Sequence, residues 1–132
     1  MKTILFACTE NKKRSKLAEA IFNHLAHEQQ LDARAISAGT IPASETDPEV
    51  AVLLATYGVE YAASTPRKLT DEMLRSADRI ISFGCLIPDM FPKEKFEEWL
   101  VDDPQTPEQY RAAYSIIKLK VEALLAFLRE SN

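Results

Sequence analysis

The chain has 132 residues, of which 46% are hydrophobic and 27% are charged, and its formal net charge is -4. This length suits one domain that buries a core, and the acidic balance argues against nucleic-acid binding, which needs a basic face. No apolar run is long enough for a membrane span, and the first residues lack the pattern of a signal peptide. We therefore expect one domain over residues 1–132, located in the cytoplasm, with no nucleic-acid or membrane partner.

Apolar segments bounded by polar loops mark the first part of the chain. Residues 3–7 predict a buried strand that ends next to Cys8, and residues 34–38 predict a second strand that closes at Gly39. Ser15 stands at the start of an amphipathic helix, either as its cap or facing the preceding loop. The apolar face of that helix comprises Ala18, Ile21, Phe22 and Leu25.

Helix caps and short apolar runs mark the rest of the chain. Cap residues predict three further helices, which begin at Asp47, Thr70 and Thr106. The runs 79–84 and 96–101 predict a third and a fourth strand. Strands that alternate with amphipathic helices favour a parallel sheet covered on both faces. The expected fold is therefore α/β, a three-layer sandwich with a four-stranded parallel sheet between helices.

The loop after the first strand combines a cysteine, three cations and a helix start. In open parallel sheets, sites lie beyond the carboxyl ends of the strands, where Cys8 and Cys85 are both expected. Backbone N–H groups of such a loop and the helix dipole can cradle an anion. Arg14 can bind two oxygens of a tetrahedral oxyanion, and these positive surroundings would lower the pKa of the Cys8 thiol and favour the nucleophilic thiolate. A cysteine at a strand end is more often a small core residue, so the spacing alone does not decide.

The stretch CTENKKRSKLAEAIF, residues 8–22, resembles the phosphate-binding signature of the low-molecular-weight protein tyrosine phosphatase superfamily. That superfamily includes the thiol-dependent arsenate reductases. Three further segments resemble it in the same order: ISAGT at residues 36–40, DPEVAVLLATYGVE at residues 47–60, and DDP at residues 102–104 before a long final helix. The resemblance covers nearly the whole chain and implies the low-molecular-weight phosphatase fold.

The resemblance also implies roles for the residues around the loop. Cys8 would be the nucleophile, and Arg14 would bind the oxyanion and stabilise charge in the transition state. Asp103, directly before Pro104, would be the general acid that protonates the leaving oxygen, with Asp102 as its rival. The cradle would comprise Thr9, Glu10, Asn11, Lys12, Lys13, Arg14 and Ser15, in which Asn11 shapes the loop and Ser15 supports the thiolate.

Two branches of the superfamily remain open, and a second thiol separates them. A phosphatase hydrolyses its phosphocysteine, whereas a reductase needs another thiol to convert arsenate to arsenite. Cys85, within RIISFGCLIPDMFPKEKFEEWLVDDP at residues 79–104, resembles the resolving cysteine of the reductase branch. Gln105 and Thr106 also favour that branch, because the phosphatases usually have a tyrosine pair there. The segment STPRKLT, residues 64–70, is more similar to the phosphatases.

The leading hypothesis is therefore an arsenate reductase-like enzyme, and the alternative is a low-molecular-weight protein tyrosine phosphatase. The expected partners are a small oxyanion (arsenate, phosphate or a phosphate monoester) and a thioredoxin, a glutaredoxin or a small-thiol reductant. No cofactor is expected, and no metal, because His24 and His27 stand without further ligands nearby. A non-catalytic anion-binding domain is a third alternative, because the Glu10 carboxylate, where the family often has glycine, opposes both thiolate and oxyanion.

Overall fold

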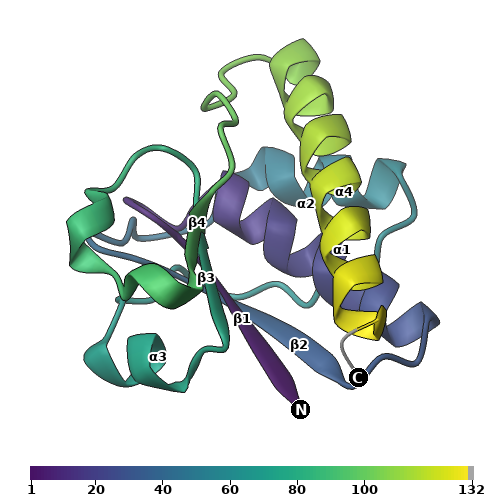
Figure 1. Ribbon diagram of the computed structural model, residues 1–132. Coiled ribbons are helices and arrows are strands. Elements are labelled where there is room, and N and C mark those ends of the chain that lie inside the picture. Colours follow the sequence, from purple (N-terminus) through teal and green to yellow (C-terminus); the bar gives the residue numbers. More distant parts are fainter. Residues whose placement is uncertain (131–132) are drawn as a thin grey trace.

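The computed structural model describes residues 1–130 and contains one parallel sheet with helices packed against it. The strands lie in the order β2–β1–β3–β4, and each neighbouring pair is parallel. The expected α/β fold is therefore confirmed (Figure 1). The strands are β1 (Lys2–Cys8), β2 (Ala33–Gly39), β3 (Arg79–Ser82) and β4 (Phe96–Glu98), and the helices are α1 (Arg14–Glu28), α2 (Pro48–Thr56), α3 (Asp71–Ser76) and α4 (Pro107–Glu130).

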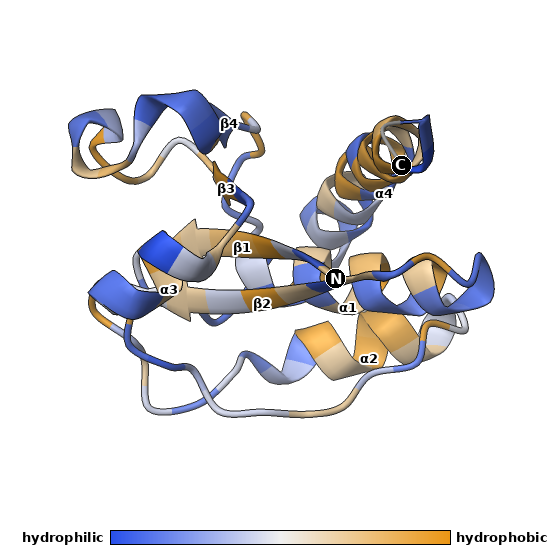
Figure 2. Cartoon of the chain, turned by 60° about the horizontal axis from the view of Figure 1, so that its bottom comes forward, coloured by the Kyte–Doolittle hydropathy of each residue, from blue (hydrophilic) through white to orange (hydrophobic). Residues whose placement is uncertain are grey.

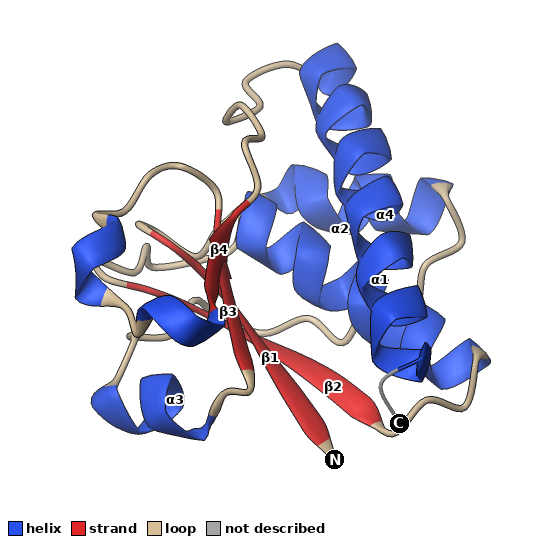
Figure 3. Cartoon of the chain, in the orientation of Figure 1, coloured by secondary structure: helices blue, strands red, loops and turns tan. Residues whose placement is uncertain are grey.

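Two unequal layers cover the sheet (Figure 3). One layer comprises α1, α2 and α4, and the larger cluster of buried apolar side chains lies between these helices and the sheet. The short α3 lies on the other side with two 3-10 turns, Pro88–Met90 and Lys93–Lys95, over a smaller cluster. β1 is drawn mostly in orange, hydrophobic shades in Figure 2, and residues 4–7 are fully buried because apolar layers cover both its faces.

The helix starts follow the caps that the sequence predicts. The Asp47 carboxylate accepts a hydrogen bond from the N–H of Glu49, and the Thr70 hydroxyl accepts one from the N–H of Met73. The Thr106 hydroxyl does the same for the first turn of α4. These contacts satisfy N–H groups that have no partner within the helix. Among residues 1–130, no helix has the length and apolar character needed to cross a bilayer.

The third and fourth strands are shorter than predicted, and the difference matters for the site. β3 ends at Ser82, because Gly84 adopts a φ of 82°, which is incompatible with a strand. The N–H of Trp99 still donates to the Ser82 carbonyl at 2.8 Å. Beyond it the chain leaves the sheet, and the Val101 carbonyl accepts a hydrogen bond from Arg14. Residues predicted as strand therefore form a wall beside the loop that follows β1.

Candidate active site

The loop that follows β1 is tight, and two residues allow its shape. Asn11 adopts the left-handed conformation, with a φ of 55°, which asparagine tolerates better than most residues. Gly39 lies opposite Cys8 on the neighbouring strand β2. A Cβ atom at Gly39 would lie 2.6 Å from the carbonyl oxygen of Thr9 and 3.0 Å from the nitrogen of Asn11. The loop can therefore lie against β2 only because residue 39 has no side chain.

Hydrogen bonds converge on the Cys8 sulfur at the base of this loop. The backbone N–H of Asn11 donates to Sγ at 3.1 Å, and Ser15 Oγ lies 2.9 Å from Sγ. The side chain of Asn11 fixes the direction of the second contact. Its Oδ1 accepts from the N–H of Arg67 at 2.9 Å, so its Nδ2 donates to Ser15 Oγ, also at 2.9 Å. The Ser15 oxygen then acts as an acceptor toward Asn11, and its hydrogen is left to be donated to the sulfur.

Ser15 therefore supports the thiol and does not cap α1. The helix begins at Arg14, and Lys13 occupies the cap position without a side-chain cap hydrogen bond. Ser15 is fully buried in the first turn. Of the two roles that the sequence allows for this serine, the structure has the one that faces the loop.

The pKa of the Cys8 thiol is raised above its ordinary value, mainly because burial disfavours the charged thiolate. The hydrogen bonds from Ser15 and Asn11 act in the opposite direction but do not outweigh burial, and the charge of Cys85 adds to the rise. The expectation that positive surroundings lower this pKa is therefore wrong for this structure. The physical reason is that the sulfur is buried, whereas the nearby guanidinium is engaged elsewhere.

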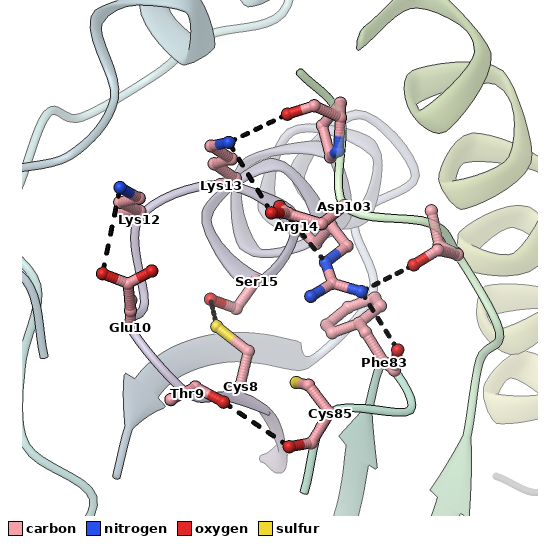
Figure 4. Close-up of polar contacts among 12 residues, drawn as sticks. Cys8, Thr9, Glu10, Lys12, Lys13, Arg14, Ser15, Phe83, Cys85 and Asp103 are labelled. Carbon is pink, nitrogen blue, oxygen red and sulfur yellow. Dashed lines mark hydrogen bonds and ion pairs between the residues drawn. The ribbon is translucent and has the colours of Figure 1, made fainter. Parts of the chain in front are cut away.

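That guanidinium belongs to Arg14, which lies at the mouth of the loop (Figure 4). Its Nη1 donates to the carbonyl of Phe83 at 3.1 Å and to that of Val101 at 2.6 Å. Its Nε lies 3.9 Å from a carboxylate oxygen of Asp103. The contacts tie the start of α1 to the segments that follow β3 and β4. An oxyanion above Cys8 would meet an arginine whose position is already fixed.

Asp103 is the acid that the fold brings to this mouth. Besides its contact with Arg14, its carboxylate lies 3.7 Å from Lys13 Nζ and accepts a hydrogen bond from Gln105 at 2.9 Å. Lys13 also donates to the Pro104 carbonyl at 2.9 Å. The structure thus places the Asp103 carboxylate in contact with two cations of the loop, Lys13 and Arg14.

Cys85 lies at the same mouth, on the segment that follows β3 (Figure 4). Its carbonyl accepts a hydrogen bond from the Thr9 hydroxyl at 3.5 Å, and its side chain packs against the core cluster that contains Cys8. Both cysteines are free thiols, Cys8 buried and Cys85 partly exposed. The structure therefore brings together the two thiols that the sequence separates by 76 positions.

Glu10 does not point its carboxylate into the cradle. The carboxylate lies 3.8 Å from Lys12 Nζ on the outer side of the loop, and more than half of its side chain is exposed (Figure 4). The backbone of Glu10 remains part of the loop, where its carbonyl accepts a hydrogen bond from the N–H of Ala43. The negative charge is therefore screened by water and by a cation, which weakens the argument that it prevents anion binding.

Sequence reasoning missed three parts of this arrangement. The carbonyls of Phe83 and Val101 hold Arg14, the N–H of Arg67 orients Asn11, and Lys16 is fully buried in the first turn of α1. Backbone groups carry no signal in a sequence, and a lysine in an amphipathic helix normally indicates a solvated position. Among residues 1–130, no three His, Cys, Asp or Glu side chains lie so that they could hold a metal ion.

The comparisons with known proteins agree with this geometry. A family model described as low molecular weight phosphotyrosine protein phosphatase matches residues 3–132. The chain is 27% identical over 132 residues to a glutaredoxin arsenate reductase of Synechocystis sp., covering 96% of this chain and 98% of that protein. The chain therefore belongs to the low molecular weight phosphotyrosine protein phosphatase family, and its relatives there are enzymes of two kinds, phosphatases and arsenate reductases.

Solved structures of both kinds share the fold. A low molecular weight phosphotyrosine phosphatase of Vibrio cholerae superposes with a TM-score of 0.92 at 23% identity, over 100% of this chain and 99% of that one. A thioredoxin-dependent arsenate reductase of Corynebacterium glutamicum superposes with a TM-score of 0.83 at 27% identity, over 100% of this chain and 64% of that one. The fold and the family are thus settled, and the choice between the two activities depends on the site.

Proposed function

We propose that this chain is an arsenate reductase-like enzyme in which Cys8 attacks the oxyanion and Cys85 resolves the product. The observation that carries the proposal is the position of Cys85. Its backbone carbonyl accepts a hydrogen bond from the cradle residue Thr9, and its charge acts on the pKa of the Cys8 thiol. Hydrolysis of a phosphocysteine requires no second thiol, whereas reduction of arsenate does. The relatives named arsenate reductase add support for the same assignment.

The first step forms a bond between sulfur and arsenic. The Cys8 thiolate attacks arsenate held by the N–H groups of the loop and by Arg14, and one hydroxyl group of the protonated arsenate leaves as water once Asp103 has supplied a proton. Ser15 and Asn11 donate to the sulfur and so favour the thiolate over the thiol. Arg14 already lies in place through the carbonyls of Phe83 and Val101, so little ordering is needed when the anion binds.

The second step reduces the arsenic. The Cys85 thiolate attacks the sulfur of the Cys8 adduct, a Cys8–Cys85 disulfide forms, and the electron pair of the sulfur–arsenic bond stays on arsenic. Arsenic(V) thus gains two electrons and leaves as arsenite, while two thiols become one disulfide. A dithiol protein such as a thioredoxin or a glutaredoxin, or a small thiol, would then reduce the disulfide by thiol–disulfide exchange.

The competing function is hydrolysis of a phosphate monoester through phosphocysteine. It is favoured by the description of the family model that matches the chain and by the segment at residues 64–70, which is more similar to the phosphatases. The residues directly after Pro104 argue against a phosphotyrosine substrate, because Gln105 and Thr106 are exposed and polar. No aromatic side chain therefore stands at this position to pack against a phenyl ring.

One paired assay separates these functions. Wild type and Cys85→Ser are given arsenate with dithiothreitol or with thioredoxin and its reductase, and separately an aryl phosphate. We expect the wild type to form arsenite, and Cys85→Ser to lose turnover with thioredoxin while its single-turnover Cys8 adduct remains detectable by mass spectrometry. Hydrolysis of the aryl phosphate by both proteins, without arsenite, would establish the phosphatase instead. Phosphate binding without turnover of either substrate would establish an anion-binding domain.

A further inference from the structure

Lys16 is a buried lysine in a place that disfavours a cation. It is the third residue of α1, and only 1% of it is exposed. Lysine is almost never fully buried unless its charge is compensated, and the positive end of a helix dipole opposes a cation in the first turn. Neither composition nor amphipathic pattern explains this position, because the side chain lies on the buried face of the helix. Its contacts therefore require an explanation.

The partners of the Lys16 ammonium lie on the long coil between α2 and α3. The ammonium donates to the Ser64 hydroxyl at 2.7 Å and to the Thr65 carbonyl at 3.2 Å. A second bond, from the Thr46 hydroxyl to the Ser64 carbonyl at 2.9 Å, holds the same coil. Both partners of Lys16 are neutral oxygens, so the contacts fix the position of the coil without neutralising the charge.

The charged groups that act on Lys16 include the nucleophile. Burial lowers the pKa of the Lys16 ammonium, while the charges of Glu19 and Cys8 raise it and that of Arg67 lowers it further. Glu19 itself accepts a hydrogen bond from Ser37. A thiolate at Cys8 therefore favours the charged form of Lys16.

The coil held by Lys16 is the one that orients the groups around Cys8. Two residues beyond Thr65, the N–H of Arg67 donates to Asn11 Oδ1. This contact turns Asn11 Nδ2 toward Ser15, and Ser15 then donates to the Cys8 sulfur. A continuous series of contacts thus leads from the buried lysine through residues 64–67 to the thiol.

We propose that Lys16 is a positioning residue for Cys8, which holds residues 64–67 against α1 so that Asn11 and Ser15 direct a hydrogen bond at the sulfur. The proposal rests on the proposed role of Cys8 as the nucleophile, but ionisation of the thiol can be measured without any turnover. Failure of the proposed reaction and failure of this inference are therefore distinguishable. Loss of Lys16 removes both the anchor of the coil and a nearby positive charge, and both changes disfavour the thiolate.

The test uses the full chain with Cys85→Ser, so that Cys8 is its only thiol. The rate of alkylation by iodoacetamide is followed against pH in this background and in Lys16→Met, Lys16→Gln and Lys120→Met, the last being an exposed lysine on α4 that serves as control. We expect Lys16→Met to slow alkylation near neutral pH by about three- to tenfold and to shift the pH midpoint upward. Lys16→Gln, which keeps a donor for Ser64, should show a smaller change, and Lys120→Met none.

A double-mutant cycle separates positioning from charge alone. In a Ser15→Ala background, Lys16→Met should shift the alkylation midpoint clearly less than it does alone, because the group that it positions is gone and only the loss of the nearby charge remains. Additive effects of the two substitutions would overturn the proposal in favour of a simple charge effect. If Lys16→Met does not fold by circular dichroism, Ser64→Ala takes its place in the cycle, since it removes one anchor and keeps the cation. Folded variants whose midpoints equal that of the control would also overturn the proposal.

Discussion

The two thiols of the site stand in opposite surroundings. Cys8 is buried, accepts a hydrogen bond from the Asn11 backbone and contacts Ser15, and its loop is fitted against Gly39. Cys85 is partly exposed, on a segment that leaves β3 through the positive φ of Gly84. These surroundings match the role proposed for each thiol. A nucleophile gains from a fixed geometry, whereas a resolving thiol must travel to its partner.

The largest effect should come from replacing the buried thiol, Cys8. Cys8→Ser keeps a group of similar size but replaces the only nucleophile of the cradle. We expect turnover of arsenate and of aryl phosphate to fall by at least about a thousandfold. Phosphate binding, measured by calorimetry, should persist within a few-fold, because the N–H groups of the loop and Arg14 remain. Retained turnover would mean that the chemistry lies elsewhere.

The next test concerns Asp103, the carboxylate on the exposed side of the site. Asp103→Asn removes the proposed proton donor and should lower single-turnover adduct formation by about a hundredfold. The matched control is Asp102→Asn, which changes the same charge one residue earlier and should lower it less than about threefold. The pH profiles of both variants identify the acid. Equal rates for Asp103→Asn and wild type on a poor leaving group would remove Asp103 from the reaction.

A third test returns to the loop and its fit against β2. Gly39→Ala would place a Cβ atom 2.6 Å from the Thr9 carbonyl oxygen and should destabilise the fold by about 1–3 kcal/mol. Gly84→Ala is the comparison on the other side, where a Cβ would meet only the end of the Leu100 side chain at 3.3 Å, and its cost, about 1–2 kcal/mol, comes from the positive φ. Urea denaturation measures both. We expect phosphate affinity to fall in the Gly39 variant alone.

The sequence predicts the parts of the molecule that depend on local patterns. Helix starts at Asp47, Thr70 and Thr106 follow from capping chemistry, and the sheet follows from apolar runs between helices. The predicted ends of β3 and β4 are wrong, because in each case the apolar run continues past the residue at which the backbone leaves the sheet. Periodicity records burial, and residues such as Trp99 and Val101 stay buried after the strand has ended.

The candidate site also has parts that depend on local sequence patterns and parts that depend on the folded structure. The loop of Cys8 and Arg14 could be predicted because its side chains carry the chemistry and their spacing is local. The position of Cys85 near this loop follows from the parallel sheet, because both cysteines come after the carboxyl ends of strands. Its role as a resolving thiol could be expected only from resemblance. The predicted lowering of the pKa of Cys8 is wrong, because the number of nearby cations in the sequence does not show which groups their charges contact. Arg14 is bonded to the carbonyls of Phe83 and Val101, and burial dominates at the sulfur.

A smaller effect is expected for the hydrogen bond that supports the thiolate. Ser15→Ala removes a donor that lowers the pKa of Cys8, so that pKa should rise further and alkylation near neutral pH should slow by about three- to tenfold. In the wild type, the raised pKa means that the folded state binds the thiol proton more tightly than the unfolded chain. The free energy of unfolding should therefore fall as the pH rises past about 8.5, the ordinary value for cysteine. Cys8→Ser should flatten that decline.

The smallest effect is expected at Glu10, where the sequence raised the strongest objection to anion chemistry. Its carboxylate faces Lys12 on the outer side of the loop, in contact with water. An exposed pair of this kind contributes about 0–1 kcal/mol, so Glu10→Gln should strengthen phosphate binding by less than about fivefold. Because salt screens exposed charges, the gain should shrink further between low and high ionic strength. A gain of a hundredfold in phosphate affinity, or the first appearance of turnover in this variant, would instead show that Glu10 holds the native site inactive.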